Sequence, residues 1–385
     1  MEKLDEFLKN AHGFVGKEAV DVPAGVALAD WIKIRRFTGA IGDVNRLYMD
    51  PAYGGSTVLY NTMIAPPTFV AAVRTPNSRG PFIEKDYGLV DNYPATEAEA
   101  GFEWFDFIKL GEKLKSSLHL ASVAEGKGWK NRRTAVLKSE ATYQNNYGGL
   151  IAKGWGTVIL TPFERGKEMF LERKIQSYTD EEIVCIEKDI NAEASPRGDL
   201  LLYWEDVNVG DNLPGLVKGP LNLSDMMAWW VAEAKPASMG QLVYKELKNK
   251  PGMVSFNPDT GWPYWDYNQY PEDLQSCRWV GYTAPYGRGI HRVCTAGHLL
   301  TDWMGDDGFL RRLNVVNLKP FIYGDTLWLR GKVVDKYKEK IGDAMYRAVD
   351  VKIEGVNQLG ETILSGTGTA YLPSPGNPVV LPISY

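Results

Sequence analysis

The strongest constraint on the fold is that one loop motif occurs twice. The segment that begins at Asp43 reads Asp-Val-Asn-Arg-Leu-Tyr-Met-Asp, and the segment that begins at Asp259 reads Asp-Thr-Gly-Trp-Pro-Tyr-Trp-Asp. Other landmarks recur in the same order, including Gly-Glu at Gly111 and Gly-Asp at Gly324. A self-similarity this long is not the period of a solenoid. It therefore predicts two copies of one domain, each with the same special loop.

Composition is that of an ordinary globular protein. The 385 residues leave room for two or three domains. The net charge is −5, and no basic stripe is available to neutralise phosphates, so we expect neither nucleic acid nor a membrane as a partner. No apolar run approaches the ~18 residues of a membrane span. Three cysteines form no disulfide framework and the N-terminus lacks a signal-peptide pattern, so we predict a cytoplasmic protein.

The first half predicts a helix, the special loop, a core helix and then strands. We expect the first helix over residues 29–37 and the apolar core helix over 64–73, where two prolines suit a helix start. Residues 76–100 read as a long loop. Alternating apolar and polar residues then predict strands at 114–123, 134–143 and 150–160.

The second half repeats this order after a charged linker. Thr179 and Glu182 form a capping-box pattern that predicts a helix start within the linker. A helix is expected over 223–234 and an insertion over 235–257. After the second loop, a core helix is expected over 290–304 and strands at 327–334, 346–353 and 361–371.

These patterns predict an α+β protein in which each half wraps a sheet around one apolar helix. The predicted domains are 1–162 and 205–385, joined by a helical linker over 163–204. If the halves paired edge to edge, they would extend one sheet and remove an exposed edge.

Several segments in order carry a resemblance to a known family. They are the segments at 42–50, 64–69, 203–211, 218–221, 298–308 and 324–326. The chain resembles the MaoC-like, double hot-dog acyl-CoA dehydratases and (R)-specific enoyl-CoA hydratases over roughly residues 25–375. This resemblance implies a tandem hot-dog fold and a hydro-lyase acting on an acyl-CoA, with no cofactor beyond the CoA of the substrate.

The family motif is Gly-Asp-x-Asn-Pro-x-His, whose Asp and His act on water while glycine amides at the core helix hold the thioester oxygen. Carried across, its Asp positions are Asp43 and Asp259, and its His positions are Tyr48 and Tyr264. Both halves therefore depart from the family at the histidine. In the second motif, Asp259 and Asp266 match the family and the intervening residues do not.

The two loops suggest acid–base pairs. A buried Asp can act as a base, and Tyr is a plausible acid or oxyanion donor. We predict Asp259 with Tyr264, and Asp43 with Tyr48, as candidate catalytic pairs. The alternative is that each Asp caps a turn while each Tyr packs in the core. Polar side chains in the same loops add candidate substrate contacts, which are Asn45 and Asp266.

The start of the second core helix offers another set of candidates. His291 is an alternative base or an exposed histidine, and Gly289 would let the backbone approach a thioester oxygen. Arg288 and Arg292 either hold a CoA phosphate or lie in solvent. One helical face carries four potential metal ligands, which are His291, Cys294, His298 and Asp302. The resemblance implies no metal, so we predict no metal site.

The expected activity is reversible hydration of an enoyl-CoA, with a bulky acyl group suggested by the many aromatic residues. A same-fold isomerase or thioesterase is one alternative. A non-catalytic acyl-binding subunit that supports a partner hot-dog chain is another, and the missing motif histidines favour it. We also expect a homo-oligomer of the double hot-dog chain.

Overall fold

The computed structural model describes most of the chain. The described residues are 3–19, 27–77, 95–162, 168–169, 171–233, 240–249, 254–256, 260–265, 277 and 281–385. Among them, no helix is both long and apolar enough to cross a membrane.

One antiparallel sheet of nine strands runs through both halves. The first half supplies β1 (Ala95–Trp104), β2 (Leu114–Lys127), β3 (Arg133–Asn145) and β4 (Leu150–Leu160). The second half supplies β5 (Leu216–Lys218), β8 (Phe309–Asn317), β9 (Leu327–Ile341), β10 (Ala344–Asn357) and β11 (Thr362–Tyr371). The order is β2-β3-β4-β1-β8-β11-β10-β9-β5, so the two sets of four long strands mirror each other about the β1–β8 pair.

The β1–β8 pair confirms that the halves join edge to edge. Gly101 of β1 lies opposite Asn314 of β8. A Cβ at Gly101 would lie 2.4 Å from the Trp155 ring and 2.5 Å from Asn314 Oδ1. The Trp155 indole donates to Asn314 Oδ1 at 2.7 Å, and the Asn314 amide donates to Glu99 Oε1 at 3.0 Å. Glycine therefore lets a polar network from both halves close over the joint.

The sequence prediction missed both joining strands. The expected loop over 76–100 was wrong at its end, because β1 starts at Ala95. This strand is rich in Ala and Glu, which are depleted in strands, and its last residues are buried without strict alternation. Pairing on both sides, with β4 and β8, decides its conformation.

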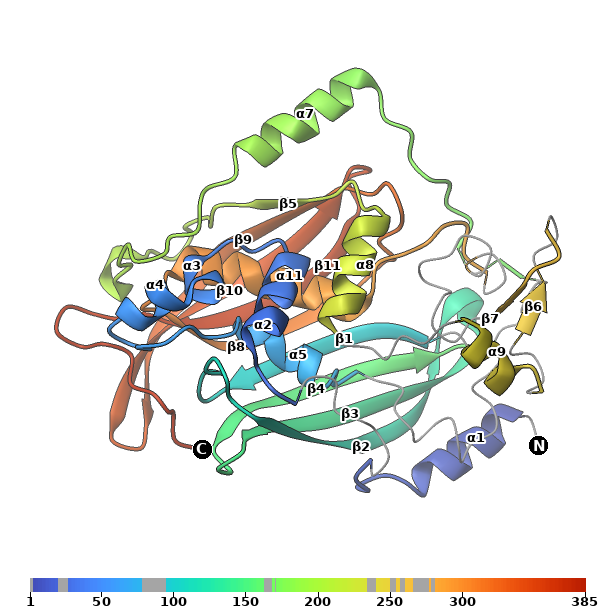
Figure 1. The fold of residues 1–385 in the computed structure, drawn as a ribbon, viewed down its shortest axis with the longest axis horizontal. Coiled ribbons are helices and arrows are strands. Elements are labelled where there is room, and N and C mark those ends of the chain that lie inside the picture. Colours follow the sequence, from blue (N-terminus) through green and yellow to red (C-terminus); the bar gives the residue numbers. More distant parts are fainter. Residues whose placement is uncertain are drawn as a thin grey trace.

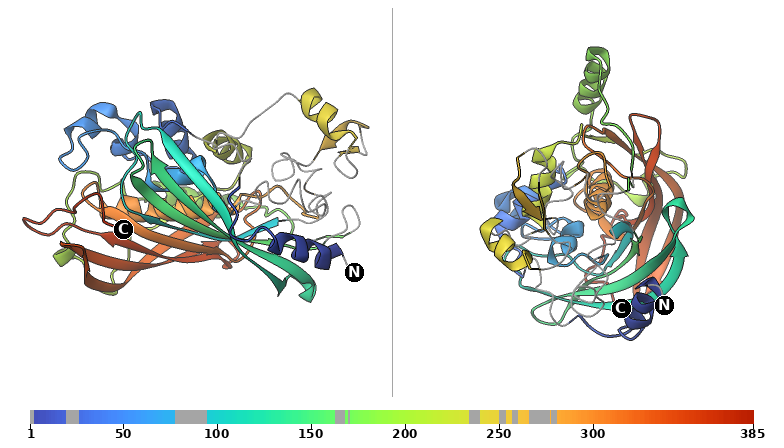
Figure 2. Two further views of the ribbon diagram at one scale, coloured as in Figure 1. Left: turned by 90° about the horizontal axis from the view of Figure 1, so that it is seen from below. Right: turned by 90° about the vertical axis from the view of Figure 1, so that its right-hand side faces the viewer.

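The two core helices differ in length. In the second half, α11 (Gly289–Met304) has 16 residues and is buried along nearly its whole length. The sheet curves around α11, which is seen almost end-on in the right-hand view of Figure 2. In the first half the expected helix is shorter, with η1 (Pro67–Phe69) followed by α5 (Val70–Val73). The two cross closely, because a Cβ at Gly297 would lie 2.6 Å from Thr68 Cγ2.

A second layer of helices covers the core helices. The helices α2 (Trp31–Ala40) and α8 (Leu223–Ala232) match the predicted pair, and their rings at Phe37 and Trp229 lie 5.7 Å apart. Figure 1 shows α2 and the short helices after it on the same side of the sheet as α11. The other elements are α1 (Lys3–His12), α3 (Arg46–Met49), α4 (Pro51–Ser56), η3 (Trp129–Asn131), η4 (Trp204–Asp206), α9 (Gly240–Leu247), β6 (Val254–Phe256) and β7 (Pro263–Trp265).

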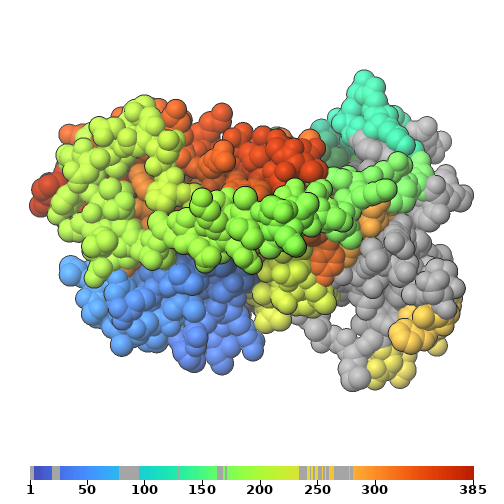
Figure 3. Space-filling model, turned by 90° about the horizontal axis from the view of Figure 1, so that it is seen from above, coloured from blue at the N-terminus to red at the C-terminus, as the bar shows by residue number. Residues whose placement is uncertain are grey.

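The linker contains one α-helix, and the segment before this helix is held against the second half by ion pairs. The capping box between Thr179 and Glu182 is confirmed at the start of α7 (Asp180–Asn191), and Ile186 is the buried residue of this helix. Most of the linker was expected to be helical, but among its described residues before η4 only α7 is a helix. The linker runs as a green band between the blue first-half helices and the red strands (Figure 3).

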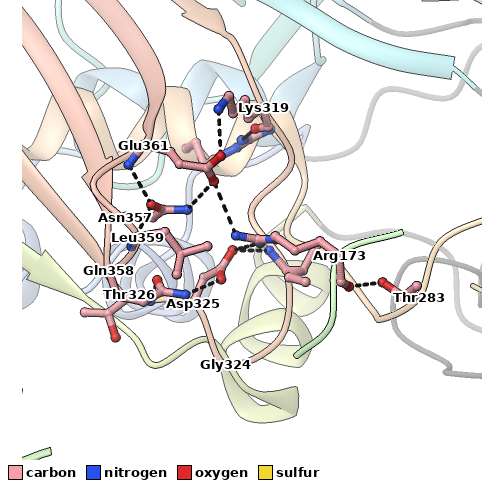
Figure 4. A network of polar contacts seen from close by, with 12 residues as sticks. Arg173, Thr283, Lys319, Gly324, Asp325, Thr326, Asn357, Gln358, Leu359 and Glu361 are labelled. Atoms are coloured by element: carbon pink, nitrogen blue, oxygen red, sulfur yellow. Dashed lines mark hydrogen bonds and ion pairs between the residues drawn. The ribbon is translucent and has the colours of Figure 1, made fainter. Parts of the chain in front are cut away.

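In the linker segment before α7, Arg173 lies between Asp325 and Glu361 and forms ion pairs with both (Figure 4). Asp325 is 1% exposed and also accepts a hydrogen bond from Gln358 at 2.8 Å. This network ties the linker to the second half.

Candidate functional site

The loop after α2 is held by local hydrogen bonds. Gly42 has a φ of +71°, which favours glycine, and it turns the chain out of the helix. Asp43 Oδ1 accepts a hydrogen bond from Asn45 N at 2.8 Å, and Asn45 Oδ1 caps α3 by accepting from Leu47 N at 2.9 Å. The turn-forming role that we considered for Asp43 is therefore present. It uses only one of the two carboxylate oxygens.

The structure brings Asp43 to the side of α11. His298 Nε2 lies 3.8 Å from Asp43 Oδ1 and 3.0 Å from Asp302 Oδ2. Asp43 is 1% exposed and His298 is 3% exposed. Since Asp43 comes from the first half and the other two residues come from the second, the group spans both halves. We call it the Asp43–His298–Asp302 cluster.

Burial makes this cluster electrostatically unusual. Burial raises the pKa of Asp43 from 3.8 to about 6, the attraction of His298 partly opposes this rise, and the repulsion of Asp302 adds to it. A carboxyl group with a pKa near 6 is a much better base near neutral pH than an exposed aspartate. Perturbed carboxyls of this kind are concentrated at functional sites.

Several polar atoms of the cluster have no hydrogen-bond partner among the described residues. They are Asp43 Oδ2, Asp302 Oδ1 and both ring nitrogens of His298. Leaving a buried polar atom unsatisfied costs about 1–3 kcal/mol. An arrangement with several such atoms facing one another is typical of a site that receives another molecule.

Tyr48 does not act as a substitute base. It is 3% exposed in an apolar cluster with Leu47, Tyr60 and Ile64. Burial, followed by the negative charge of Asp43, raises the pKa of Tyr48 well above its usual value of 10. The phenol is therefore neutral at physiological pH, which is consistent with a hydrogen-bond donor and excludes a base.

Asn45 connects the halves, and its expected role in substrate binding is not supported. Its Nδ2 donates to Asp306 Oδ1 at 2.9 Å, and Tyr53 donates to the other oxygen of Asp306 at 2.5 Å. With its Oδ1 capping α3, both polar ends of the Asn45 side chain are occupied by protein. Asp306 lies just after α11, so this bridge holds the Asp43 loop against that helix. Neither Asp306 nor Tyr53 was predicted as a site residue.

Lys218 begins the segment 218–221 and was not predicted to lie near the site. It ends β5, and its ammonium donates to Gly42 O at 3.3 Å. Burial lowers the pKa of Lys218, and attraction to Glu193, Asp302 and Asp43 opposes this. A cation thus lies close enough to the Asp43–His298–Asp302 cluster to be affected by its charge.

His291 lies two turns before His298 on α11 and faces another partner. Its Nε2 is 2.8 Å from Ala40 O, and because a carbonyl only accepts, this nitrogen carries the proton. The ring stacks on Trp229, with centroids 4.6 Å apart. Burial lowers the pKa of His291 to about 4. Seven residues correspond to about 10 Å along a helix, so His291 does not join Asp43.

The start of α11 is occupied by the protein itself. A Cβ at Gly289 would lie 2.8 Å from Glu97 Cβ and Glu97 O, and the Glu97 carboxylate accepts from Ile290 N at 2.9 Å. Gly289 therefore allows close packing against β1. The approach of a thioester oxygen that we expected there is not supported.

The arginines that we considered for a CoA phosphate are engaged within the protein. Arg292 is buried, donates to Lys319 O at 2.5 Å, and has a pKa that burial lowers to about 10. Arg288 Nε lies 3.9 Å from Glu233 Oε2. Of the two alternatives for Arg292, the position in solvent is wrong, because the side chain is buried.

The second loop remains a prediction. Asp259 and Asp266 lie outside the described residues. Tyr264 lies in β7, opposite Ser255 of β6, and its side chain is outside the described part of the chain.

Comparisons with known proteins agree with this architecture. Residues 29–153 match the family model of the FAS1-like dehydratase domain region. A comparison with curated protein sequences found no match. The matched region contains Asp43 and Tyr48, whereas His298 and Asp302 lie beyond it.

Solved structures resemble the chain over almost its full length. One MaoC-like dehydratase has a TM-score of 0.65 at 16% identity, covering 94% of this chain and 99% of its own. A MaoC-like dehydratase from Phytophthora capsici has a TM-score of 0.53 at 12% identity, covering 96% and 99%. A putative MaoC domain protein dehydratase from Chloroflexus aurantiacus J-10-fl has a TM-score of 0.52 at 12% identity, covering 93% and 98%. The chain therefore has the double hot-dog fold of the MaoC-like dehydratases, and residues 29–153 match the model of a dehydratase domain region.

Proposed function

We propose that this protein is a hydro-lyase that reversibly hydrates an enoyl thioester to a 3-hydroxyacyl thioester. The observation that carries the proposal is the buried Asp43 carboxyl facing His298 across the two halves, 3.8 Å away. The dehydratase-type match of residues 29–153 supports the reaction class. We propose CoA as the thiol, with no cofactor beyond it, and a homo-oligomer as the assembled form.

In the hydration direction, Asp43 would act on water. Its ionised carboxylate takes a proton as the oxygen attacks C3 of the enoyl group. With a pKa of about 6, Asp43 is largely ionised at neutral pH and still able to accept a proton. A protonated His298 would then deliver a proton to C2, and dehydration reverses both steps. In this mechanism His298 takes the role of the motif histidine from a different element.

Charge on the enolate oxygen needs a separate donor. Lys218 is one candidate, because its ammonium lies near the cluster on Gly42 O. The neutral phenol of Tyr48 is the other, since its pKa responds to the charge of Asp43. Either would stabilise the negative charge that develops on the thioester carbonyl. A bulky acyl group is part of the proposal, and it rests on the high aromatic content of the sequence.

The replacement of the motif histidine supports one rival function. Tyr48 is packed in an apolar cluster, as expected if the first-half motif had become structural. In that case the chain would be a non-catalytic acyl-binding subunit of a partner hot-dog protein. Isomerase or thioesterase activity on the same carboxylate is a further alternative.

The test is turnover of a panel of enoyl-CoAs, followed by the loss of the enoyl-thioester absorbance. We expect Asp43→Asn to lower kcat/KM by at least about 100-fold, since general acid–base groups contribute about 10²–10⁴-fold. Asp50→Asn is the matched control, because Asp50 belongs to the same motif but caps α4 near the surface. Asp259→Asn shows which copy of the motif works.

No turnover of any thioester, together with stable pairing to another hot-dog chain, would support the subunit function instead. Hydrolysis of acyl-CoAs without hydration would identify a thioesterase.

A further inference from the structure

The Asp43–His298–Asp302 cluster has the spacing of a metal site. Its three ligand atoms, one from each residue, lie within 4.8 Å of one another. Two ligands that each bind one ion at about 2.0–2.2 Å can be at most about 4.4 Å apart. The contacts of His298 Nε2 with Asp302 at 3.0 Å and with Asp43 at 3.8 Å satisfy this limit.

The unpartnered atoms of the cluster supply the independent evidence for a ligand. Asp43 Oδ2 and the ring nitrogens of His298 have no hydrogen-bond partner among the described residues, although both side chains are almost completely buried. Although Nε2 is 3.0 Å from Asp302 Oδ2, no N–H···O hydrogen bond forms between them. A cation between the three groups would satisfy the lone pairs that face it.

The supporting elements hold these ligands in place. His298 and Asp302 are one turn apart on the buried helix α11, a spacing that puts two ligands on one face. Asp43 is fixed by the hydrogen bond from Asn45 N, and Asn45 is fixed in turn by Asp306. Cys294 and His291, the other members of the expected helical face, contact Thr68 O and Ala40 O instead.

We infer that Asp43, His298 and Asp302 bind a divalent first-row transition metal ion, of the class of Zn²⁺ or Mn²⁺. One imidazole and two carboxylates suit such ions, whereas Mg²⁺ and Ca²⁺ favour oxygen ligands alone. The ion would compete with the ammonium of Lys218, which donates to Gly42 O. Bound there, it would join the first-half loop to the second-half helix. This inference concerns ligand binding and holds whether or not the protein hydrates thioesters.

The experiment is calorimetric titration of chelator-treated full-length protein with Zn²⁺, Mn²⁺ and Mg²⁺. We expect one Zn²⁺ or Mn²⁺ ion per chain, bound more tightly than Mg²⁺, and a higher Tm with the ion. Asp302→Asn should weaken binding at least about 10-fold, because even indirect partners of a metal contribute about 10–100-fold. His119→Gln is the matched control, since His119 forms an exposed pair with Glu140 at 3.2 Å and should leave the affinity unchanged.

Failure of the wild-type protein to bind either transition metal more tightly than Mg²⁺ would overturn the inference, and so would equal affinity in Asp302→Asn. If Asp302→Asn does not fold, the site is tested instead by the absorption spectrum of Co²⁺ bound to the wild-type protein. Bands of a nitrogen- and oxygen-ligated ion, displaced by Zn²⁺, are expected, and their absence contradicts the site. Hydration measured in chelator-treated protein separates the two proposals. If the protein hydrates enoyl-CoA but its titration shows no metal binding, the metal site is refuted and the proposed activity is not.

Discussion

The two halves share one architecture but contribute different parts of the site. The first-half core helix is the short pair η1 and α5, and the segment from 67 to 73 contains no titratable residue. The second-half helix α11 is longer and carries His298 and Asp302. In exchange, the first half supplies the loop with Asp43. The two halves thus have the same arrangement of helices and strands. The Asp43–His298–Asp302 cluster forms where the first-half loop contacts the second-half helix α11.

The largest expected effect distinguishes two histidines of α11. His298→Gln should lower kcat/KM for enoyl-CoA hydration by about 100-fold or more, because it removes the imidazole that faces Asp43. His291→Gln keeps a hydrogen-bond donor for Ala40 O, so we expect it to lower kcat/KM by less than about 10-fold. Steady-state kinetics of both variants is the measurement. Equal losses would show that the working imidazole is not the one beside the first-half loop.

The pH dependence should follow Asp43. Because its folded pKa of about 6 lies above its usual value of 3.8, the folded protein holds this proton more tightly than the unfolded chain does. The contribution of Asp43 to the free energy of unfolding is therefore fully present below pH 3.8 and is lost as the pH rises through about 6.

Activity should change in the opposite direction. The basic form of Asp43 is lost below about pH 6, so kcat/KM should fall there. Denaturant unfolding and kinetics of chelator-treated wild type and Asp43→Asn, compared at about pH 4 and 7, provide the check. A stability difference between the proteins that does not change with pH would show that Asp43 titrates as an exposed carboxyl does.

The joint between the halves should be sensitive to one methyl group. Gly101→Ala puts a Cβ within 2.4 Å of the Trp155 ring, so we expect it to lower the free energy of unfolding by about 1–3 kcal/mol. Gly39→Ala is the control, because no atom lies within 4 Å of its Cβ, and in a helix Ala is favoured over Gly by up to about 1 kcal/mol. Chemical denaturation measures both. If Gly101→Ala were neutral, the joint would be looser than the polar network suggests.

The smallest effect is expected in the linker. Thr179→Ala removes one side of the capping box and should cost α7 about 1 kcal/mol. Since Ile186 is the buried residue of α7, this loss should remain local and leave the global free energy of unfolding nearly unchanged. Hydrogen exchange of the α7 amides tests this. Faster exchange throughout the strands of both halves would show that the linker stabilises the pair.

The fold was largely predictable, and its exceptions have a physical cause. The long strands β2, β3 and β9–β11 can be recognised from alternating apolar and polar residues, because one face of each strand is buried and the other is not. The strands β1 and β8 form the joint, and their sequences were not recognised as strands. In β1 the reason is its Ala and Glu content and the absence of strict alternation, since several successive residues are buried. The short core helix of the first half was placed correctly but was expected to be longer.

The site was predicted only in part. Asp43 was named because its loop is repeated, whereas His298 and Asp302 were seen only as a face of one helix. Gly289 and Arg292 were chosen for their position at a helix start, yet Glu97 and Lys319 already occupy those positions. Glu97 is far from Gly289 in the sequence and Lys319 lies outside the helix that carries Arg292, so these contacts could not be predicted before the fold was known.

The sequence by itself determined the duplication, the order of helices and strands in each half, and the Asp-containing loop, because these depend on residues close together in the chain. Only the tertiary structure decided that Asp43 faces His298 and Asp302 rather than His291. That choice depends on how the first-half loop docks on α11, which is fixed by the β1–β8 joint and by the contacts of Asn45 and Tyr53 with Asp306.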